Sequence, residues 1–123
     1  MNSVVISIGS NCKERQEAVQ KSIDFLSGKL QSPRASDCYS TPASNGKDAD
    51  YLNAVLVGDT HDSREKFEAL LKLYEVANGR TKLCKQEGVI PIDLDLVVWN
   101  GEVVRPADFN KDYFQIGWKQ LER

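Results

Sequence analysis

The segment "IPIDLDLVVW", residues 90–99, has the alternation of a buried β-strand and carries two acidic residues. Its aliphatic residues occupy alternate positions: Ile92, Leu94, Leu96 and Val98. Because successive side chains of a strand point to opposite faces of a sheet, Asp93 and Asp95 share the face opposite to the aliphatic side chains. Acidic residues are rare in strands, and like charges on one face repel each other. The pair therefore indicates either a solvated sheet face or a site for a hard cation such as Mg²⁺, which prefers carboxylate oxygens.

The composition is typical of a globular protein with one compact core. The chain has 123 residues, of which 41% are hydrophobic and 28% are charged, which is enough for one domain and too little for two. The net charge of −2 gives no field that favours nucleic acid or a membrane surface. No apolar run approaches the roughly 18 residues of a membrane span, and residues 1–11 lack the features of a signal peptide. The three cysteines are odd in number and fit no short metal-binding spacing, so we expect reduced thiols in a cytoplasmic, single-domain protein spanning residues 1–123.

Strand and helix signals alternate along the chain. Strands are expected at residues 4–9, 34–40, 51–60 and 90–99. Helices are expected from residue 11 to residue 30 and, with Asp62 as the N-cap, from residue 62 to residue 78. An Asn-Gly turn at 100–101 leads into a short strand at 102–105, and the tail from residue 107 onwards is compatible with a helix. This order predicts an α+β fold, a ferredoxin-like βαββαβ antiparallel sheet with both helices on one face, plus a C-terminal hairpin.

The strand predicted at 51–60 places further polar side chains beside the two aspartates. Its alternate aliphatic residues are expected to pack on the helices: Leu52, Ala54 and Leu56. Tyr51 and Asn53 then face the same side as the aspartates. A tyrosine ring and an amide suit a flat, polar heterocycle, although both also occur in ordinary strands. The following loop is basic, with Arg80, Lys82 and Lys85, and it can either neutralise phosphate groups beside a metal or form a solvated surface.

Five segments carry a more specific signal through their order and spacing. They are "IGSN" at 8–11, "YSTP" at 39–42, "DYLNAV" at 50–55, "YEVANGR" at 74–80 and "IDLDLVVWNGEVV" at 92–104. Together they resemble the 6-hydroxymethyl-7,8-dihydropterin pyrophosphokinase family of folate biosynthesis. The resemblance implies a ferredoxin-like fold and the transfer of a pyrophosphoryl group from ATP to the pterin hydroxymethyl oxygen, with two Mg²⁺ ions. Pterin and ATP are then the expected partners.

The resemblance also implies roles for individual residues. Asp93 and Asp95 would hold the metal ions, and with Arg80 they would form the catalytic group. Four residues would lie at the pterin pocket, beside the turn at Gly9: Thr41, Pro42, Tyr51 and Asn53. Three residues would lie on the ATP side: Glu75, Arg80 and Lys82.

The chain also departs from the family pattern. Before its aspartates the family has an Arg-Trp-Gly-Pro-Arg-Thr type of run, and here Gln86, Glu87 and Ile90 stand at the Arg, Trp and second Arg positions. Asp108 and Phe114 lie near the places of a family histidine and arginine, and the chain is short at its C-terminus. Because these losses remove cations that meet phosphate, we expect a weakened ATP site. The alternatives are a catalytically inactive relative that binds a pterin or nucleotide, or a ferredoxin-like module for self-association; the sequence leaves the oligomeric state open.

Overall fold

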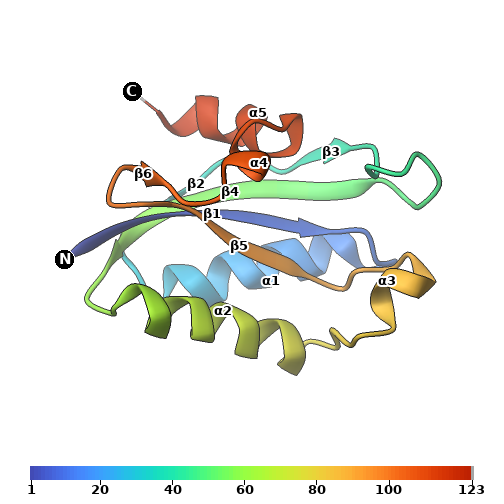
Figure 1. Cartoon of the computed structure of the whole chain (residues 1–123), viewed down its shortest axis with the longest axis horizontal. Helices are drawn as coiled ribbons and strands as arrows, with labels where there is room; N and C mark the ends of the chain where they lie inside the picture. Colours follow the sequence, from blue (N-terminus) through green and yellow to red (C-terminus); the bar gives the residue numbers. More distant parts are fainter. Residues whose placement is uncertain (123) are drawn as a thin grey trace.

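The computed structural model describes residues 1–122, which form one antiparallel sheet with helices on both faces (Figure 1). The strands are β1 (Asn2–Ser10), β2 (Gln31–Ala35), β3 (Tyr39–Thr41), β4 (Tyr51–Thr60), β5 (Asp93–Trp99) and β6 (Glu102–Val103). The helices are α1 (Arg15–Ser27), α2 (Arg64–Ala77), α3 (Cys84–Glu87), α4 (Pro106–Phe109) and α5 (Asp112–Leu121). The strand order is β2-β4-β1-β5-β6, and β3 also pairs with β4. The predicted α+β class is confirmed.

Helices α1 and α2 cover one face of the sheet, as the two amphipathic stripes predict (Figure 1). Their buried, sheet-facing residues are Val19, Ile23, Leu26, Phe67, Leu71 and Tyr74. The predicted cap of α2 is wrong by one residue. Ser63 is the N-cap, and its hydroxyl accepts a hydrogen bond from the backbone N–H of Lys66 at 3.2 Å. Asp62 instead lies 3.5 Å from the ammonium group of Lys66.

The C-terminal helices α4 and α5 lie on the opposite face of the sheet (Figure 1). The predicted placement of helices on one face therefore holds for α1 and α2 and does not hold for α4 and α5. The second core on this face consists of Val5, Val55, Val97, Val98, Phe114 and Leu121. Gly117 permits the close approach of α5, because a Cβ atom there would lie 2.7 Å from Val55 Cγ2 and 2.8 Å from Tyr39 Oη. The apolar stripe of the tail therefore closes a second layer over the sheet.

A β-bulge changes the predicted alternation at the end of β5. Ile6 of β1 pairs with Leu96, whereas the preceding Val5 pairs with Val98, so Val97 is an extra residue. Val98 consequently joins the core beneath α5, and Trp99 packs against the core beneath α1 and α2. The prediction that Val98 shares a face with Leu96 is wrong, because the bulge shifts the register by one residue.

The strand predicted at 34–40 is interrupted. Ala35 pairs with Leu56 and Tyr39 pairs with Asn53, which leaves one extra residue between β2 and β3 relative to β4. After β5, Asn100 and Gly101 both have positive φ, as in a type I′ turn, and β6 pairs back onto β5. Within residues 1–122, no helix combines the length and the apolar character that crossing a bilayer requires.

Candidate functional site

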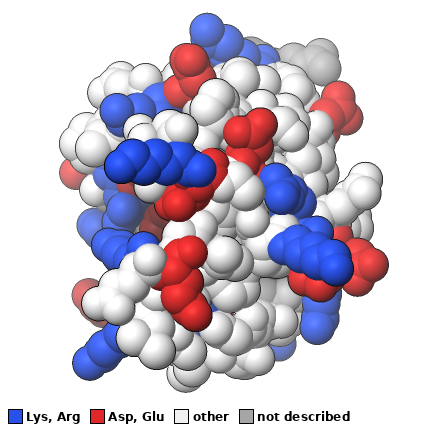
Figure 2. Space-filling model, turned by 90° about the vertical axis from the view of Figure 1, so that its right-hand side faces the viewer, with Lys and Arg blue, Asp and Glu red and all other residues white. Residues whose placement is uncertain are grey.

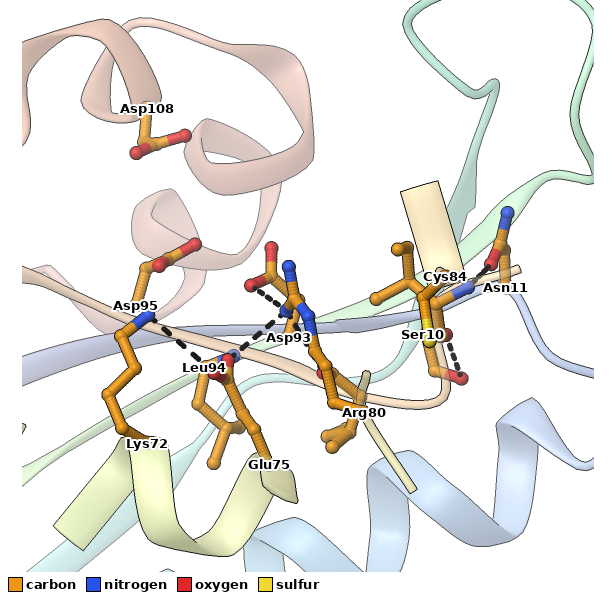
Figure 3. Close-up of polar contacts among 12 residues, drawn as sticks. Ser10, Asn11, Lys72, Glu75, Arg80, Cys84, Asp93, Leu94, Asp95 and Asp108 are labelled. Atoms are coloured by element: carbon orange, nitrogen blue, oxygen red, sulfur yellow. Dashed lines mark hydrogen bonds and ion pairs between the residues drawn. The ribbon is translucent and has the colours of Figure 1, made fainter. Parts of the chain in front are cut away.

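Strand β5 presents Asp93 and Asp95 on the face of the sheet away from α2. Figure 3 shows both carboxylates on one side of β5, while Leu94 points to the other side. Across β1, Asp93 pairs with Gly9 and Asp95 pairs with Ser7. The small residues at these two positions mean that β1 itself does not cover the two carboxylates. The alternation of β5 therefore places two acidic groups side by side, as the sequence predicts.

Burial and mutual repulsion disfavour a double negative charge at this pair. The pKa of Asp95 is raised from 3.8 to about 7, mainly by burial and next by the charge of Asp93. The guanidinium of Arg105 acts in the opposite direction, with Nη2 3.8 Å from Asp95 Oδ1. Binding of a cation or of a proton therefore stabilises the pair.

Arg80 and Glu75 tie the aspartate pair to the end of α2. Arg80 Nη1 donates to Asp93 Oδ1 at 2.7 Å, to the carbonyl of Ile92 at 3.2 Å and to Glu75 Oε2 at 3.3 Å. Glu75 is only 3% exposed, and the same Oε2 accepts the backbone N–H of Leu94 at 2.7 Å (Figure 3). Burial raises the pKa of Glu75, and the hydrogen bond from Leu94 acts against that rise. Both side chains therefore fix the position of β5, and Arg80 contacts one of the two acidic groups directly.

The third residue expected on the ATP side, Lys82, lies in the exposed turn before α3. Figure 2 shows the face at the right-hand side of Figure 1, where basic and acidic side chains are interspersed. No broad area of this face carries a single sign of charge, in keeping with the net charge of −2.

A cavity of about 270 Å³ opens beside Asp93. All four residues expected at the pterin pocket line it: Thr41, Pro42, Tyr51 and Asn53. Asn53 is buried, and its Nδ2 donates to Thr41 Oγ1 at 2.8 Å. A Cβ atom at Gly9 would lie 3.3 Å from Asn53 Oδ1 and 3.5 Å from Tyr51 Cδ2, so a side chain at that position would fill the cavity. The structure thus brings together side chains from three separate segments around one hollow.

Three residues of the C-terminal segment also lie in this region, which the sequence pattern does not predict. Tyr113 lines the cavity, and its hydroxyl donates to Asp108 Oδ1. Asp108 Oδ2 accepts from Arg105 Nε at 2.5 Å, and Figure 3 places Asp108 on the segment that faces Asp95. Burial and the bond to Asp108 raise the pKa of Tyr113. The amphipathic pattern of the tail was the available signal, but it did not reveal which side of the sheet the tail covers.

A second, smaller hollow of about 120 Å³ is lined by Asp95 together with residues of α2 and of the segment after β6. Three basic residues contribute to its lining: Arg64, Lys72 and Arg105. Leu71 and Leu96 form the apolar part of its wall. Glu68 adds an acidic group, whose Oε1 lies 2.7 Å from Arg64 Nε. The two aspartates therefore line different hollows: Asp93 lines the cavity that contains Tyr51, and Asp95 lines the smaller, more basic one.

Two positions that depart from the family pattern are parts of the core. Ile90 is 7% exposed, and its backbone N–H donates to Asn11 Oδ1 at 2.6 Å. Phe114, on α5, is fully buried in the second core. Gln86 and Glu87 are exposed on α3. None of these side chains supplies a cation near the aspartates.

The acidic pair fits Mg²⁺ better than a metal that needs a complete protein cage. In residues 1–122, no group of three or more His, Cys, Asp or Glu side chains is arranged to hold an ion. Mg²⁺ is commonly held by one or two carboxylates, with water and substrate phosphate completing its shell. Asp93 and Asp95 meet this description, because their donor set consists of hard oxygen atoms.

The chain has one informative similarity to known proteins. Residues 5–123 match the model of a family described as 7,8-dihydro-6-hydroxymethylpterin-pyrophosphokinase. No curated protein matches the chain at a significant level. Because the match covers essentially the whole sequence, the chain belongs to the 7,8-dihydro-6-hydroxymethylpterin-pyrophosphokinase family.

Proposed function

We propose that the protein transfers pyrophosphate from ATP to the hydroxymethyl oxygen of 6-hydroxymethyl-7,8-dihydropterin, in a reaction that depends on Mg²⁺. The observation that carries this proposal is the cavity lined by Tyr51 and Asn53, which opens directly onto Asp93. An acceptor alcohol bound there lies next to the residues suited to a metal–nucleotide complex. Family membership supports the same reaction class.

The first cavity has the chemistry that a pterin requires. Tyr51 and Tyr113 supply aromatic surface, and a flat bicyclic ring packs well against such surface. Asn53 donates through Nδ2 to Thr41, which orients its Oδ1 as an acceptor for the ring's N–H groups. The volume of about 270 Å³ lies slightly below the usual range for drug-sized ligands and suits a small heterocycle.

We assign the basic hollow beside Asp95 to the nucleotide. Lys72 and Arg105 line this hollow and provide positive charge for the phosphate groups. Asp93 and Asp95 would hold Mg²⁺, which when bound neutralises phosphate charge and polarises the transferred group. The protein's own contribution is positioning, because the acceptor cavity is lined by Asp93 and the hollow assigned to the nucleotide is lined by the neighbouring Asp95.

The nucleotide side is expected to be weak. Arg80 is engaged by Asp93 and Glu75, and Ile90 is buried where the family has an arginine. These observations also favour a second candidate, a catalytically inactive relative that retains pterin binding. The strand order supports the ferredoxin-like arrangement with a C-terminal hairpin, and the free cysteines support a cytoplasmic location.

Calorimetric titration tests the proposal. The purified protein is titrated with 6-hydroxymethylpterin and, separately, with Mg²⁺ and α,β-methylene ATP, alongside a full-length family member. We expect pterin affinity to be less impaired than nucleotide affinity. We expect AMP to form more slowly than in that relative, by about 10²-fold or more, because preorganised donors are missing. Asp95→Ala should abolish turnover.

Two results separate the candidates. Pterin binding without any AMP formation selects the inactive relative. Absence of both pterin and nucleotide binding refutes the proposed function.

A further inference from the structure

Arg105 is the basic side chain that lies between the aspartate pair and the second hollow. Its Nη2 is 3.8 Å from Asp95 Oδ1, which is an ionic contact and too long for a hydrogen bond. Its side chain is 49% exposed and lines the hollow that also contains Lys72. The guanidinium is therefore accessible to a ligand that approaches Asp95.

The two arginines near the aspartates differ in exposure and in which guanidinium nitrogen is engaged. Arg80 is 24% exposed, and its Nη1 is shared among the acceptors of Asp93, Ile92 and Glu75. Arg105, in contrast, donates a hydrogen bond only through Nε within the described residues 1–122. A guanidinium has five N–H donors, so Arg105 keeps its terminal groups for an oxyanion.

Asp108 holds Arg105 in this position. Its Oδ2 accepts from Arg105 Nε at 2.5 Å, and its Oδ1 accepts from the hydroxyl of Tyr113. The carboxylate is mostly buried, with 16% of its side chain exposed. Binding through Nε leaves the outer edge of the guanidinium directed away from Asp108, which is the geometry in which arginine binds phosphate with two donors.

We propose that Arg105, positioned by Asp108, binds the phosphate oxygens of the nucleotide at Asp95 and so replaces the cations that residues 86–90 do not supply. The inference rests on the proposed function, because it assumes that a nucleotide occupies the hollow beside Asp95. It assigns Arg105 as a binding residue and Asp108 as a positioning residue. It also gives the C-terminal segment a role in nucleotide affinity, in addition to closing the second core.

The experiment compares four proteins: wild type, Arg105→Ala, Arg105→Lys and Lys119→Ala. Lys119 is an exposed cation on α5 that lines neither hollow, so its removal controls for the change in net charge. Each protein is titrated with Mg²⁺ and α,β-methylene ATP, and separately with 6-hydroxymethylpterin. Arg105→Ala should weaken nucleotide binding by about 10-fold to 100-fold, the usual effect of losing a charged hydrogen bond. The nucleotide affinity of Arg105→Lys should lie between those of wild type and Arg105→Ala, because lysine keeps the charge and loses the paired donors.

Pterin affinity should stay within about twofold of wild type in all four proteins, since Arg105 does not line the first cavity. A double-mutant cycle then tests Asp108. Asp108→Asn should weaken nucleotide binding on its own, and it should add little in the Arg105→Ala background because its effect passes through Arg105. Additive effects would show that Asp108 has a merely structural role and would overturn the positioning part of the inference.

The outcomes also distinguish this inference from the function on which it rests. If wild type binds the nucleotide and Arg105→Ala binds it equally well, the inference is wrong and the proposed function stands. If Lys119→Ala weakens binding as much as Arg105→Ala, the effect is general electrostatics and the inference is again wrong. If wild type binds no nucleotide, both fail together.

Discussion

Asp95→Asn should stabilise the metal-free protein at neutral pH. The pKa of Asp95 is raised from 3.8 to about 7, which means that folding disfavours its charged form. A shift of about 3 units corresponds to about 4 kcal/mol at 1.36 kcal/mol per unit. That figure is an upper limit, because Asp93 and Arg105 respond to the substitution. We therefore expect the free energy of unfolding to rise by about 1–3 kcal/mol, within the usual range for single substitutions.

The gain should depend on pH in a defined direction. Below 3.8, Asp95 carries a proton in both the folded and the unfolded chain. Between 3.8 and about 7 the unfolded chain has lost this proton and the folded protein retains it, so wild-type stability decreases as pH rises. The advantage of Asp95→Asn should consequently grow between pH 3.8 and about pH 7 and then level off.

Urea unfolding followed by circular dichroism measures this difference at several pH values. Asp37→Asn, at an exposed aspartate, is the matched control and should show no such trend. Millimolar Mg²⁺ should stabilise wild type by binding its folded state and should leave Asp95→Asn unchanged. The reasoning would be refuted if Asp95→Asn without Mg²⁺ were no more stable than wild type at neutral pH.

Three further substitutions test other parts of the molecule. Glu75→Ala should lower the free energy of unfolding, measured by urea titration, by about 2–4 kcal/mol, because it leaves the buried N–H of Leu94 without its acceptor. Glu75→Gln keeps an oxygen there and should lower the free energy of unfolding much less. Asn53→Ala should weaken pterin binding by about tenfold in calorimetry and leave nucleotide binding unchanged; equal losses of both would contradict two separate hollows. Gly117→Ala should destabilise by about 1–3 kcal/mol in thermal unfolding, because its Cβ would meet Val55 Cγ2 at 2.7 Å, and an unchanged melting temperature would show that α5 moves away easily.

The sequence predicts those parts of the site that depend on local periodicity. Alternation in β5 places Asp93 and Asp95 on one face, and alternation in β4 places Tyr51 and Asn53 beside them. Both inferences need only the two-residue repeat of a strand and the knowledge of which face the helices cover. Tyr51, Asn53 and Asp93 therefore line one cavity, although they come from segments about 40 positions apart.

Features that depend on pairing between distant segments are not predicted. The extra residue at Val97 follows from the register between β1 and β5, and nothing in β5 alone marks it. The face covered by α5 is decided by its fit around Gly117, so the contacts of Arg105 and Asp108 could not be inferred from their position in the tail. A residue that occupies a family position can likewise lie in a different environment in this chain, and the sequence does not reveal that difference.

Ile90 illustrates this last effect and bears on where the cations of the site must come from. An arginine at this position would have to enter a site that is 7% exposed, or the loop would have to release its backbone bonds to Asn11. Burying an unpaired charge costs several kcal/mol, so restoring the family residue alone would disturb the loop before it could serve the phosphates. Positive charge for the proposed nucleotide would therefore have to come from other elements, and both Lys72 and Arg105 line the hollow at Asp95. If the nucleotide binds as proposed, the Arg105–Asp108 pair after β5 supplies the kind of cation that the segment before β5 lacks.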